Sequence, residues 1–252
     1  MEDALYARLQ GQGERTLVLL HGFGGNHRVW YDIQPALARD ARVIAYDRPG
    51  HGWSQDHRGA GSASAAVKAI LADLAARGVE KAHFAGYSMG GAIATLAAIR
   101  APERVQSLTL LAPGGFGPEI NADLLGRLAS APDADALRAA MNEMAAPGFS
   151  MSTKYVASLA AVRSLPGQRE KLAEVHALIT KGGRQGQIPR DALAALPMPV
   201  SVVWGTEDPI LPFSQTEDLP PAFRLHAVEG AGHQLLVEAE QTVIRLIRQA
   251  IR

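Results

Sequence analysis

The sequence predicts an α/β fold built around a mostly parallel sheet. Apolar runs of strand length alternate with helix-like stretches through the first 112 residues, and strand character returns near residue 200. This alternation indicates βαβ units, whose strands run parallel. The chain has 252 residues, of which 47% are hydrophobic and 20% are charged, so it can bury a substantial core.

Composition and charge exclude several kinds of protein. The 25 Lys and Arg residues balance the 25 Asp and Glu residues, so the chain lacks the basic excess that nucleic-acid-binding proteins usually show. There is no cysteine, which excludes disulfides, thiolate nucleophiles and Cys-ligated metals. The longest aliphatic run, residues 17–20, is far shorter than the ~20 residues of a membrane span. The first residues do not resemble a secretory signal, so we expect a cytoplasmic protein with neither nucleic acid nor a membrane as partner.

Four strands are expected in the first part of the chain, each a short apolar run that ends at a turn. Between the second and the third, residues 67–74 carry apolar side chains at the i, i+3, i+4, i+7 spacing of an amphipathic helix. Residues 92–99 are apolar on all sides, which suits a helix buried against a sheet. The four expected strands are Thr16–Leu20, Val43–Tyr46, His83–Tyr87 and Leu108–Leu111.

The pattern changes between residues 113 and 190, where helix-like stretches follow one another without a convincing strand. We therefore predict a core domain of residues 1–112 and 191–252, interrupted by a helical insertion of residues 113–190. Strands return at Val200–Trp204 and Arg224–Val228, before a final helix over Glu238–Ile251. The helices expected in the insertion are Asn121–Leu128, Asp135–Met144, Thr153–Val162 and Glu170–Ile179.

A candidate nucleophile lies where the third strand meets the following helix. The residues Gly86-Tyr87-Ser88-Met89-Gly90 fit the pattern G-x-S-x-G. A serine on so sharp a turn has a strained backbone and needs small neighbours, and the turn points its hydroxyl out of the sheet. The sequence therefore predicts Ser88 as a nucleophile.

A serine hydroxyl needs a base, and histidine is the usual one. When a G-x-S-x-G turn supplies the nucleophile, the chain order runs Ser, acid, His. Of the eight histidines, only His176, His226 and His233 follow Ser88. His176 falls inside the insertion and His226 inside a strand, whereas His233 follows a glycine-rich loop at a strand end. These positions favour His233.

The acid should lie between the nucleophile and the base. Glu207 and Asp208 are adjacent carboxylates directly after the strand Val200–Trp204. Asp208 precedes Pro209, which biases it to an extended backbone, and we favour Asp208 over Glu207. Its role would be to hold the imidazole in the right tautomer.

A second glycine-rich loop follows the first strand as His21-Gly22-Phe23-Gly24-Gly25. Glycines let the backbone approach a ligand closely. We expect the backbone N–H groups of Phe23 and of Met89, the residue after the nucleophile, to bind a developing oxyanion.

These four blocks, in this order, resemble the α/β-hydrolase fold superfamily over residues 5–251. The resemblance implies a helical cap inserted before the strand that carries the acid. Within the superfamily, residues 111–121 resemble the hydrolase-type domain found in acetoin dehydrogenase clusters. That domain normally follows a lipoyl domain, and nothing before the first strand resembles one. We therefore expect a stand-alone hydrolase rather than acetyl transfer to lipoamide.

The resemblance implies a serine hydrolase that cleaves a carboxylic ester or a similar small acyl compound through an acyl-enzyme. Haloalkane dehalogenases and epoxide hydrolases of this fold carry Asp at the position of Ser88, which argues against those activities. C–C bond hydrolysis of a β-diketone or a meta-cleavage-type product is an alternative, although such enzymes usually carry Asn where this chain has Tyr87. A ligand-binding receptor of the same fold with slow turnover is the other alternative.

We expect a small-molecule substrate, no cofactor, no metal, and either a monomer or a homodimer. A cap that roofs the site with mostly apolar side chains favours an uncharged ester. The residues expected to contact the substrate are Gly22, Tyr87, Phe116, Met141, Met144, Phe149 and Ile210.

Overall fold

The computed structural model describes residues 4–252, and its centre is one seven-stranded sheet. The strand order is β1-β3-β2-β4-β5-β6-β7, and only β1 runs antiparallel to its neighbour among the described strands. The strands are β1 (Ala7–Gln10), β2 (Thr16–Leu20), β3 (Arg42–Tyr46), β4 (Ala82–Tyr87), β5 (Val105–Leu111), β6 (Val200–Gly205) and β7 (Arg224–Val228).

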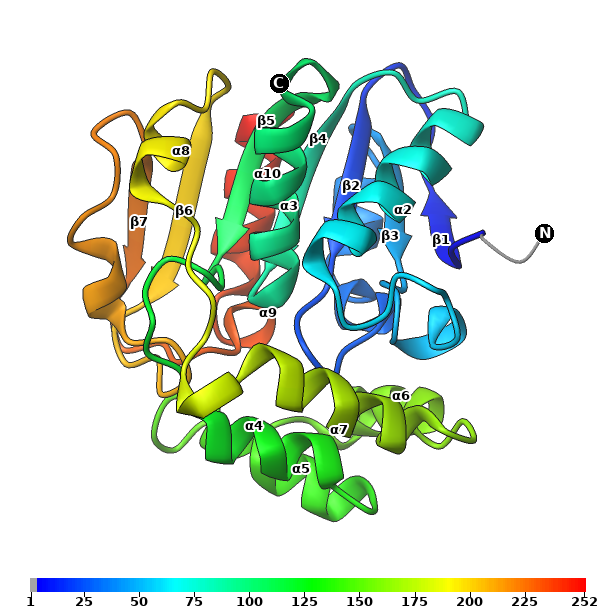
Figure 1. Ribbon diagram of the computed structural model, residues 1–252, viewed down its shortest axis with the longest axis vertical. Coiled ribbons are helices and arrows are strands. Elements are labelled where there is room, and N and C mark those ends of the chain that lie inside the picture. Colours follow the sequence, from blue (N-terminus) through cyan, green and yellow to red (C-terminus); the bar gives the residue numbers. More distant parts are fainter. Residues whose placement is uncertain (1–3) are drawn as a thin grey trace.

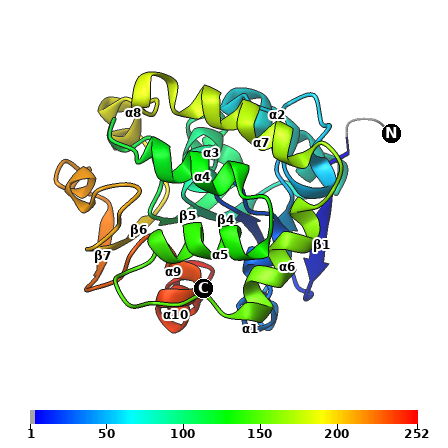
Figure 2. The ribbon, with the colours of Figure 1, turned by 90° about the horizontal axis from the view of Figure 1, so that it is seen from below.

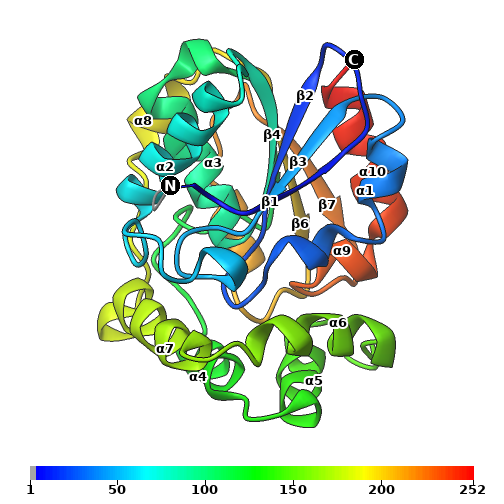
Figure 3. The same cartoon turned by 90° about the vertical axis from the view of Figure 1, so that its right-hand side faces the viewer.

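Helices cover both faces of this sheet, which is why its central strands are apolar throughout. All five residues of β2 are buried, as parallel strands between two helical layers usually are. Helices α2, α3 and α8 lie on one face, and α1, α9 and α10 lie on the other (Figure 3). Their bounds are α1 (Gln34–Leu37), α2 (Ala63–Ala76), α3 (Met89–Arg100), α8 (Arg190–Ala194), α9 (Leu235–Glu238) and α10 (Glu240–Ala250).

Four further helices lie across the edge of the sheet at which the parallel strands end (Figures 1 and 2). Three of them begin at a polar residue whose side chain accepts a backbone N–H of the first turn, namely Asn121, Asp133 and Ser152. These helices are α4 (Ala122–Ser130), α5 (Ala134–Glu143), α6 (Thr153–Arg163) and α7 (Gln168–Ile179). Short 3-10 helices complete the described chain as η1 (His27–Trp30), η2 (Gly52–Ser54), η3 (Pro102–Arg104), η4 (Lys181–Gly183) and η5 (Phe213–Thr216).

The α/β architecture with a mostly parallel sheet is confirmed, and two local expectations differ from the structure. Strand β1 was not expected, because Ala7–Gln10 is only four residues long and lies at the sheet edge, where none of its residues is fully buried. The single helix expected over Glu238–Ile251 is wrong: α9 ends at Glu238 and α10 starts at Glu240, since Ala239 leaves the helical region with φ −133°. The division into a core and an insertion at residues 113–190 stays a prediction. Within residues 4–252 no helix has the length and apolarity to span a membrane.

Candidate active site

Ser88 lies on a strained turn between β4 and α3. Its backbone has φ 52° and ψ −120°, a region that non-glycine residues rarely adopt. Hydrogen bonds hold the turn in place: the Ser88 N–H donates to the Leu111 carbonyl (2.8 Å), and the Ser88 carbonyl accepts from Gly91 (2.8 Å) and Gly114 (3.0 Å). Because strain of this kind persists only where the surroundings fix it, the turn is a built feature of the site.

Two glycines allow other backbone segments to approach this turn. A Cβ on Gly86 would lie 2.5 Å from the Gly90 carbonyl oxygen, and a Cβ on Gly90 would overlap the carbonyl oxygens of Leu20 and His21. The end of β2 is therefore in direct contact with the turn. It brings the loop of residues 21–25 beside Ser88, where a Cβ on Gly22 would lie 3.1 Å from the Ser88 Cβ.

His233 is paired with Asp208 beneath the surface. The imidazole Nδ1 donates to Asp208 Oδ2 at 2.7 Å, and the two side chains are 1% and 0% exposed. The other carboxylate oxygen, Oδ1, accepts the backbone N–H groups of Ile210 (2.8 Å) and Leu211 (2.9 Å). Since Nδ1 carries the proton in this pair, Nε2 is the nitrogen left to act as a base. Glu207 is exposed, so the structure places Asp208 rather than Glu207 against the imidazole.

The loop that carries His233 is tied to its surroundings by backbone hydrogen bonds. The carboxylate of Glu238 accepts the N–H groups of Gly232, Gln234 and Ala146, each at 2.8 Å. The His233 N–H donates to the carbonyl of Met144, also at 2.8 Å. Because residues 144–146 follow α5, the position of the imidazole depends on the helices that lie across the sheet edge.

The His233 loop packs against the turn that carries Ser88. The rings of His233 and Tyr87, the residue before Ser88, lie with their centroids 5.2 Å apart. The other two candidate histidines do not contact this pair: the His176 Nε2 is 2.8 Å from the Ala122 carbonyl and its ring centroid is 6.2 Å from that of Phe23, and His226 belongs to β7.

Two arginines hold the carbonyl groups of the loop after β2. The buried Arg48 donates from Nε to the His21 carbonyl (2.7 Å) and from Nη2 to the Gly22 carbonyl (2.9 Å). Arg163, from α6, donates to the Gly24 carbonyl at 3.2 Å. The C=O and N–H of a trans peptide point in opposite directions, so holding the Gly22 carbonyl turns the N–H of Phe23 away from Arg48. The sequence did not predict this role for either arginine, because nothing in a local pattern distinguishes them from surface arginines.

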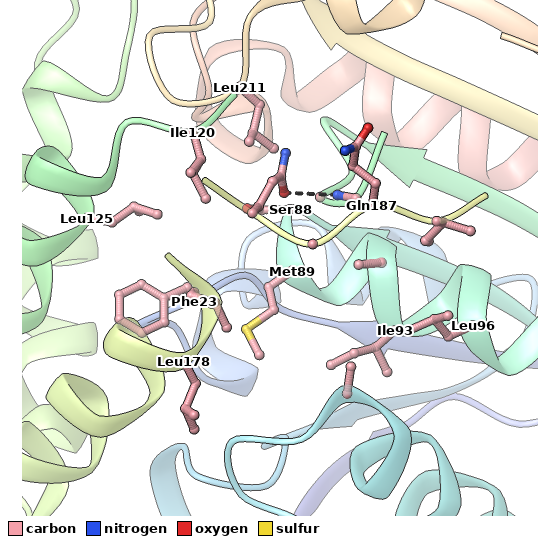
Figure 4. Close-up of a pocket in the computed structure, with 18 of the residues that line it drawn as sticks. Phe23, Ser88, Met89, Ile93, Leu96, Ile120, Leu125, Leu178, Gln187 and Leu211 are labelled. Atoms are coloured by element: carbon pink, nitrogen blue, oxygen red, sulfur yellow. Dashed lines mark hydrogen bonds between the residues drawn. The ribbon is translucent and has the colours of Figure 1, made fainter. Parts of the chain in front are cut away.

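A cavity of about 350 Å³ opens beside Ser88 (Figure 4). Met89, Ile93 and Leu96 of α3 form one side of it. Phe23, from the loop after β2, and Leu178, from α7, form other parts of the wall (Figure 4). Within residues 4–252, no charged side chain lines it. The lining residues are Phe23, Gly61, Ala63, Ser88, Met89, Ala92, Ile93, Leu96, Gly114, Gly115, Ile120, Leu125, Leu178, Ile179, Gln185, Gly186, Gln187, Ile188 and Leu211.

A second, smaller cavity of about 30 Å³ lies beside Phe23 and Tyr87. It is lined by residues of α4, α5 and α6 together with the loop after β2. Its lining residues are Phe23, Gly24, Gly25, Val29, Tyr87, Leu128, Leu137, Met141, Met144, Tyr155, Leu159 and Gln234.

The residues expected to contact substrate divide into two groups. Tyr87, Met141 and Met144 line the small cavity, and Gly22 lies beside Ser88. Phe116, Phe149 and Ile210 line neither cavity: the buried Phe116 ring packs against Trp204 with centroids 6.4 Å apart, and Phe149 and Ile210 pack into the core. Most of the wall of the large cavity was not expected, because Leu178, Ile188 and the glutamines between them reach it only through the tertiary fold.

Comparison with known proteins agrees with this architecture. A family model for the α/β hydrolase fold matches residues 15–240. The chain belongs to this family. The α/β hydrolase is 37% identical over 235 residues to the dihydrolipoyllysine-residue acetyltransferase component of the acetoin cleaving system of Pseudomonas putida, a match that covers 93% of this chain and 63% of that relative. The chain therefore spans less than two thirds of the length of this relative, and the resemblance seen in residues 111–121 is confirmed.

Two further matches concern proteins of more similar length. The hydrolase is 30% identical to the pimeloyl-[acyl-carrier protein] methyl ester esterase of Vibrio parahaemolyticus, over 87% of this chain and 86% of that protein. The solved structure of a Rhodococcus 2-hydroxy-6-oxo-6-phenylhexa-2,4-dienoate hydrolase matches with a TM-score of 0.83 and 25% identity, over 98% of this chain and 94% of that one. Proteins named as hydrolases and esterases are thus among the matches of this chain, and a catalytic triad and an oxyanion hole are typical of its fold.

Proposed function

We propose that the enzyme hydrolyses uncharged carboxylic esters through an acyl-enzyme on Ser88. The observation that carries this proposal is the buried His233–Asp208 pair packed against the strained Ser88 turn, at a cavity with no charged side chain in its described lining. The arrangement matches the roles of nucleophile, base and orienting acid in serine hydrolases.

In this proposal, Ser88 Oγ attacks the ester carbonyl while His233 Nε2 takes the hydroxyl proton. The oxyanion that forms accepts hydrogen bonds from the N–H groups of Phe23 and Met89, the second of which begins α3 and has no partner within its helix. Imidazolium then gives its proton to the leaving alcohol. Water, deprotonated by His233, attacks the acyl-enzyme and releases the carboxylic acid. Asp208 keeps the Nδ1 proton in place throughout.

C–C bond hydrolysis is the second candidate, and the match to the Rhodococcus dienoate hydrolase favours it. A dienoate substrate carries a carboxylate, which a site stabilises with a cationic group. The large cavity offers apolar side chains and the amides of Gln185 and Gln187 instead. The esterase relative and this uncharged lining support ester hydrolysis as the first candidate.

Stopped-flow kinetics with p-nitrophenyl acetate tests the proposal, because its activated leaving group makes acyl-enzyme formation visible. We expect a burst of one p-nitrophenolate per enzyme and an acetyl adduct on Ser88 in intact-mass and peptide analysis. Ser88→Ala should lower turnover at least a thousandfold, since removal of a triad nucleophile has effects of this size or larger. Ser164→Ala is the matched control, as the Ser164 hydroxyl is an exposed donor to the Ala161 carbonyl.

Ser88→Ala with more than a tenth of wild-type turnover would point to another nucleophile. Faster turnover of a meta-cleavage-type dienoate than of any ester would favour the C–C candidate. Tight binding of such compounds with negligible steady-state turnover would indicate a receptor.

A further inference from the structure

The two cavities differ in volume, about 350 Å³ against about 30 Å³. Phe23, whose N–H is the expected oxyanion donor, lines both of them. A substrate whose carbonyl lies at Ser88 therefore has two unequal spaces for its two halves.

The small cavity lies on the side of His233. Tyr87 lines it and contacts the His233 ring, and Gln234, the next residue of the His233 loop, lines it too. Met144, whose carbonyl accepts the His233 N–H, supplies a further part of the wall. None of residues 230–234 lines the large cavity, which has Ser88 and Met89 in its wall instead.

Acyl transfer assigns these two spaces to the two halves of an ester. The leaving oxygen receives a proton from the imidazolium, so the alcohol half must face His233. The acyl half then extends to the opposite side of the tetrahedral carbon. Building on the proposed esterase function, we propose that the small cavity takes a methyl- or ethyl-sized alcohol and that the large cavity takes a longer acyl chain.

The size and chemistry of the small cavity fit such an alcohol. At about 30 Å³, this cavity has room for a short alkoxy group such as methoxy or ethoxy and not for a long chain. The Tyr87 hydroxyl is buried without a hydrogen-bond partner among the described residues, and the Tyr87 side chain belongs to this wall. Because burial raises the pKa of Tyr87 well above its usual value, its hydroxyl keeps its proton and can donate to an alcohol oxygen.

The large cavity fits a flexible apolar chain. Ile93, Leu96 and Leu125 line it, and Leu178, which is 62% exposed, lies where the cavity meets solvent. Each methylene buried here should raise kcat/KM about fourfold, from the usual ~0.8 kcal/mol per buried methylene. The preferred substrates are therefore short-alcohol esters of medium-chain, uncharged acids.

Two isomeric esters test this assignment directly. Methyl octanoate and heptyl acetate share one composition but exchange the long and short halves, and their hydrolysis is followed by acid release in a pH-stat. We expect kcat/KM for methyl octanoate to exceed that for heptyl acetate at least tenfold. Equal rates, or faster cleavage of heptyl acetate, would overturn the assignment.

The p-nitrophenyl acetate burst separates this inference from the esterase proposal. Since p-nitrophenolate departs without a proton from His233, that ester can react with its ring in either cavity. A burst without preference for methyl octanoate contradicts only the cavity assignment. Absence of both a burst and any ester hydrolysis contradicts the esterase proposal itself.

Substitutions in the wall of each cavity should change the preference for the length of one half of the ester, the alcohol half for the small cavity and the acyl half for the large one. Met141→Ala should raise the ratio of kcat/KM for butyl octanoate over methyl octanoate at least fivefold, because it lengthens the small cavity. Leu96→Trp should lower the ratio of methyl octanoate over methyl propionate at least fivefold, because it shortens the large one. Leu159→Ala replaces Met141→Ala should the latter fail to fold by circular dichroism, and unchanged ratios in folded variants would sink the assignment.

Discussion

The loops at the strand ends and the helices α4–α7 build the site in different ways. The loops fix the side chains of the candidate site through backbone contacts: a positive φ at Ser88, carbonyl-to-glycine approaches at Gly86 and Gly90, and backbone N–H groups that hold the Asp208 carboxylate. The helices supply mostly side chains, such as Leu125 of α4, which form the cavity walls.

This difference separates reactivity from specificity. A backbone contact is lost with a single extra carbon atom, whereas a wall of apolar side chains tolerates exchange at modest cost. Substitutions in the loops should therefore change rate or folding sharply, while those in the helices should mainly change which ester is preferred.

The largest effect is expected at the acid. Asp208→Asn should lower kcat by about a thousandfold or more, because an amide cannot hold the imidazole in the tautomer that leaves Nε2 free to accept. Steady-state kinetics on a methyl ester measures it. Glu207→Gln changes the adjacent, exposed carboxylate in the same way and should stay within threefold of wild type. The reverse ranking of the two variants would show that Glu207, and not Asp208, is the acid.

The next effect, on the stability of the fold rather than on the rate, is expected at the Ser88 turn. Gly90→Ala places a carbon against the carbonyl oxygens of Leu20 and His21 and should destabilise the fold by about 3 kcal/mol, a loss of roughly 6–12 °C in melting temperature. Gly186→Ala is the control, since a Cβ there meets no atom within 4 Å. Equal melting temperatures of the two variants would contradict the close approach of β2 to the turn.

The smallest effect concerns pH and the buried histidines beside the loop after β2. Burial, with the positive charge of Arg48 as the next cause, lowers the pKa of His21 and of His51 well below 6.5. Between those lowered pKa values and about 6.5, the unfolded chain binds protons that the folded chain does not. Stability should therefore fall as pH drops from 7.5 to 5, with both histidines acting in the same direction.

Urea unfolding across this pH range measures the slope. His51→Asn removes one of the two groups and should flatten the dependence by about half, whatever its own effect on stability at pH 7.5. A slope identical to that of the wild type would mean that His51 is not kept neutral by the fold.

Much of the site could be predicted from local sequence, because its residue types carry strict backbone requirements. The glycines around Ser88 and the chain order of Ser88, Asp208 and His233 follow from the turn chemistry of a strand that meets a helix. The choice between Glu207 and Asp208 rested on a weak bias from Pro209, and only the tertiary structure shows which carboxylate is paired with the imidazole.

By itself, the sequence determined the alternation of strands and helices, the strained Ser88 turn and the order of the chemical groups, since each depends on neighbours a few residues away. The tertiary structure decided the antiparallel edge strand, the burial of Arg48 and Arg163, and the two unequal cavities. Those features arise from contacts between segments that are distant in the sequence, 27 residues apart for Arg48 and His21 and 139 residues apart for Arg163 and Gly24. Packing between such distant segments leaves no periodic signal in the chain. At each position, another side chain of similar size and polarity would give the same local sequence pattern.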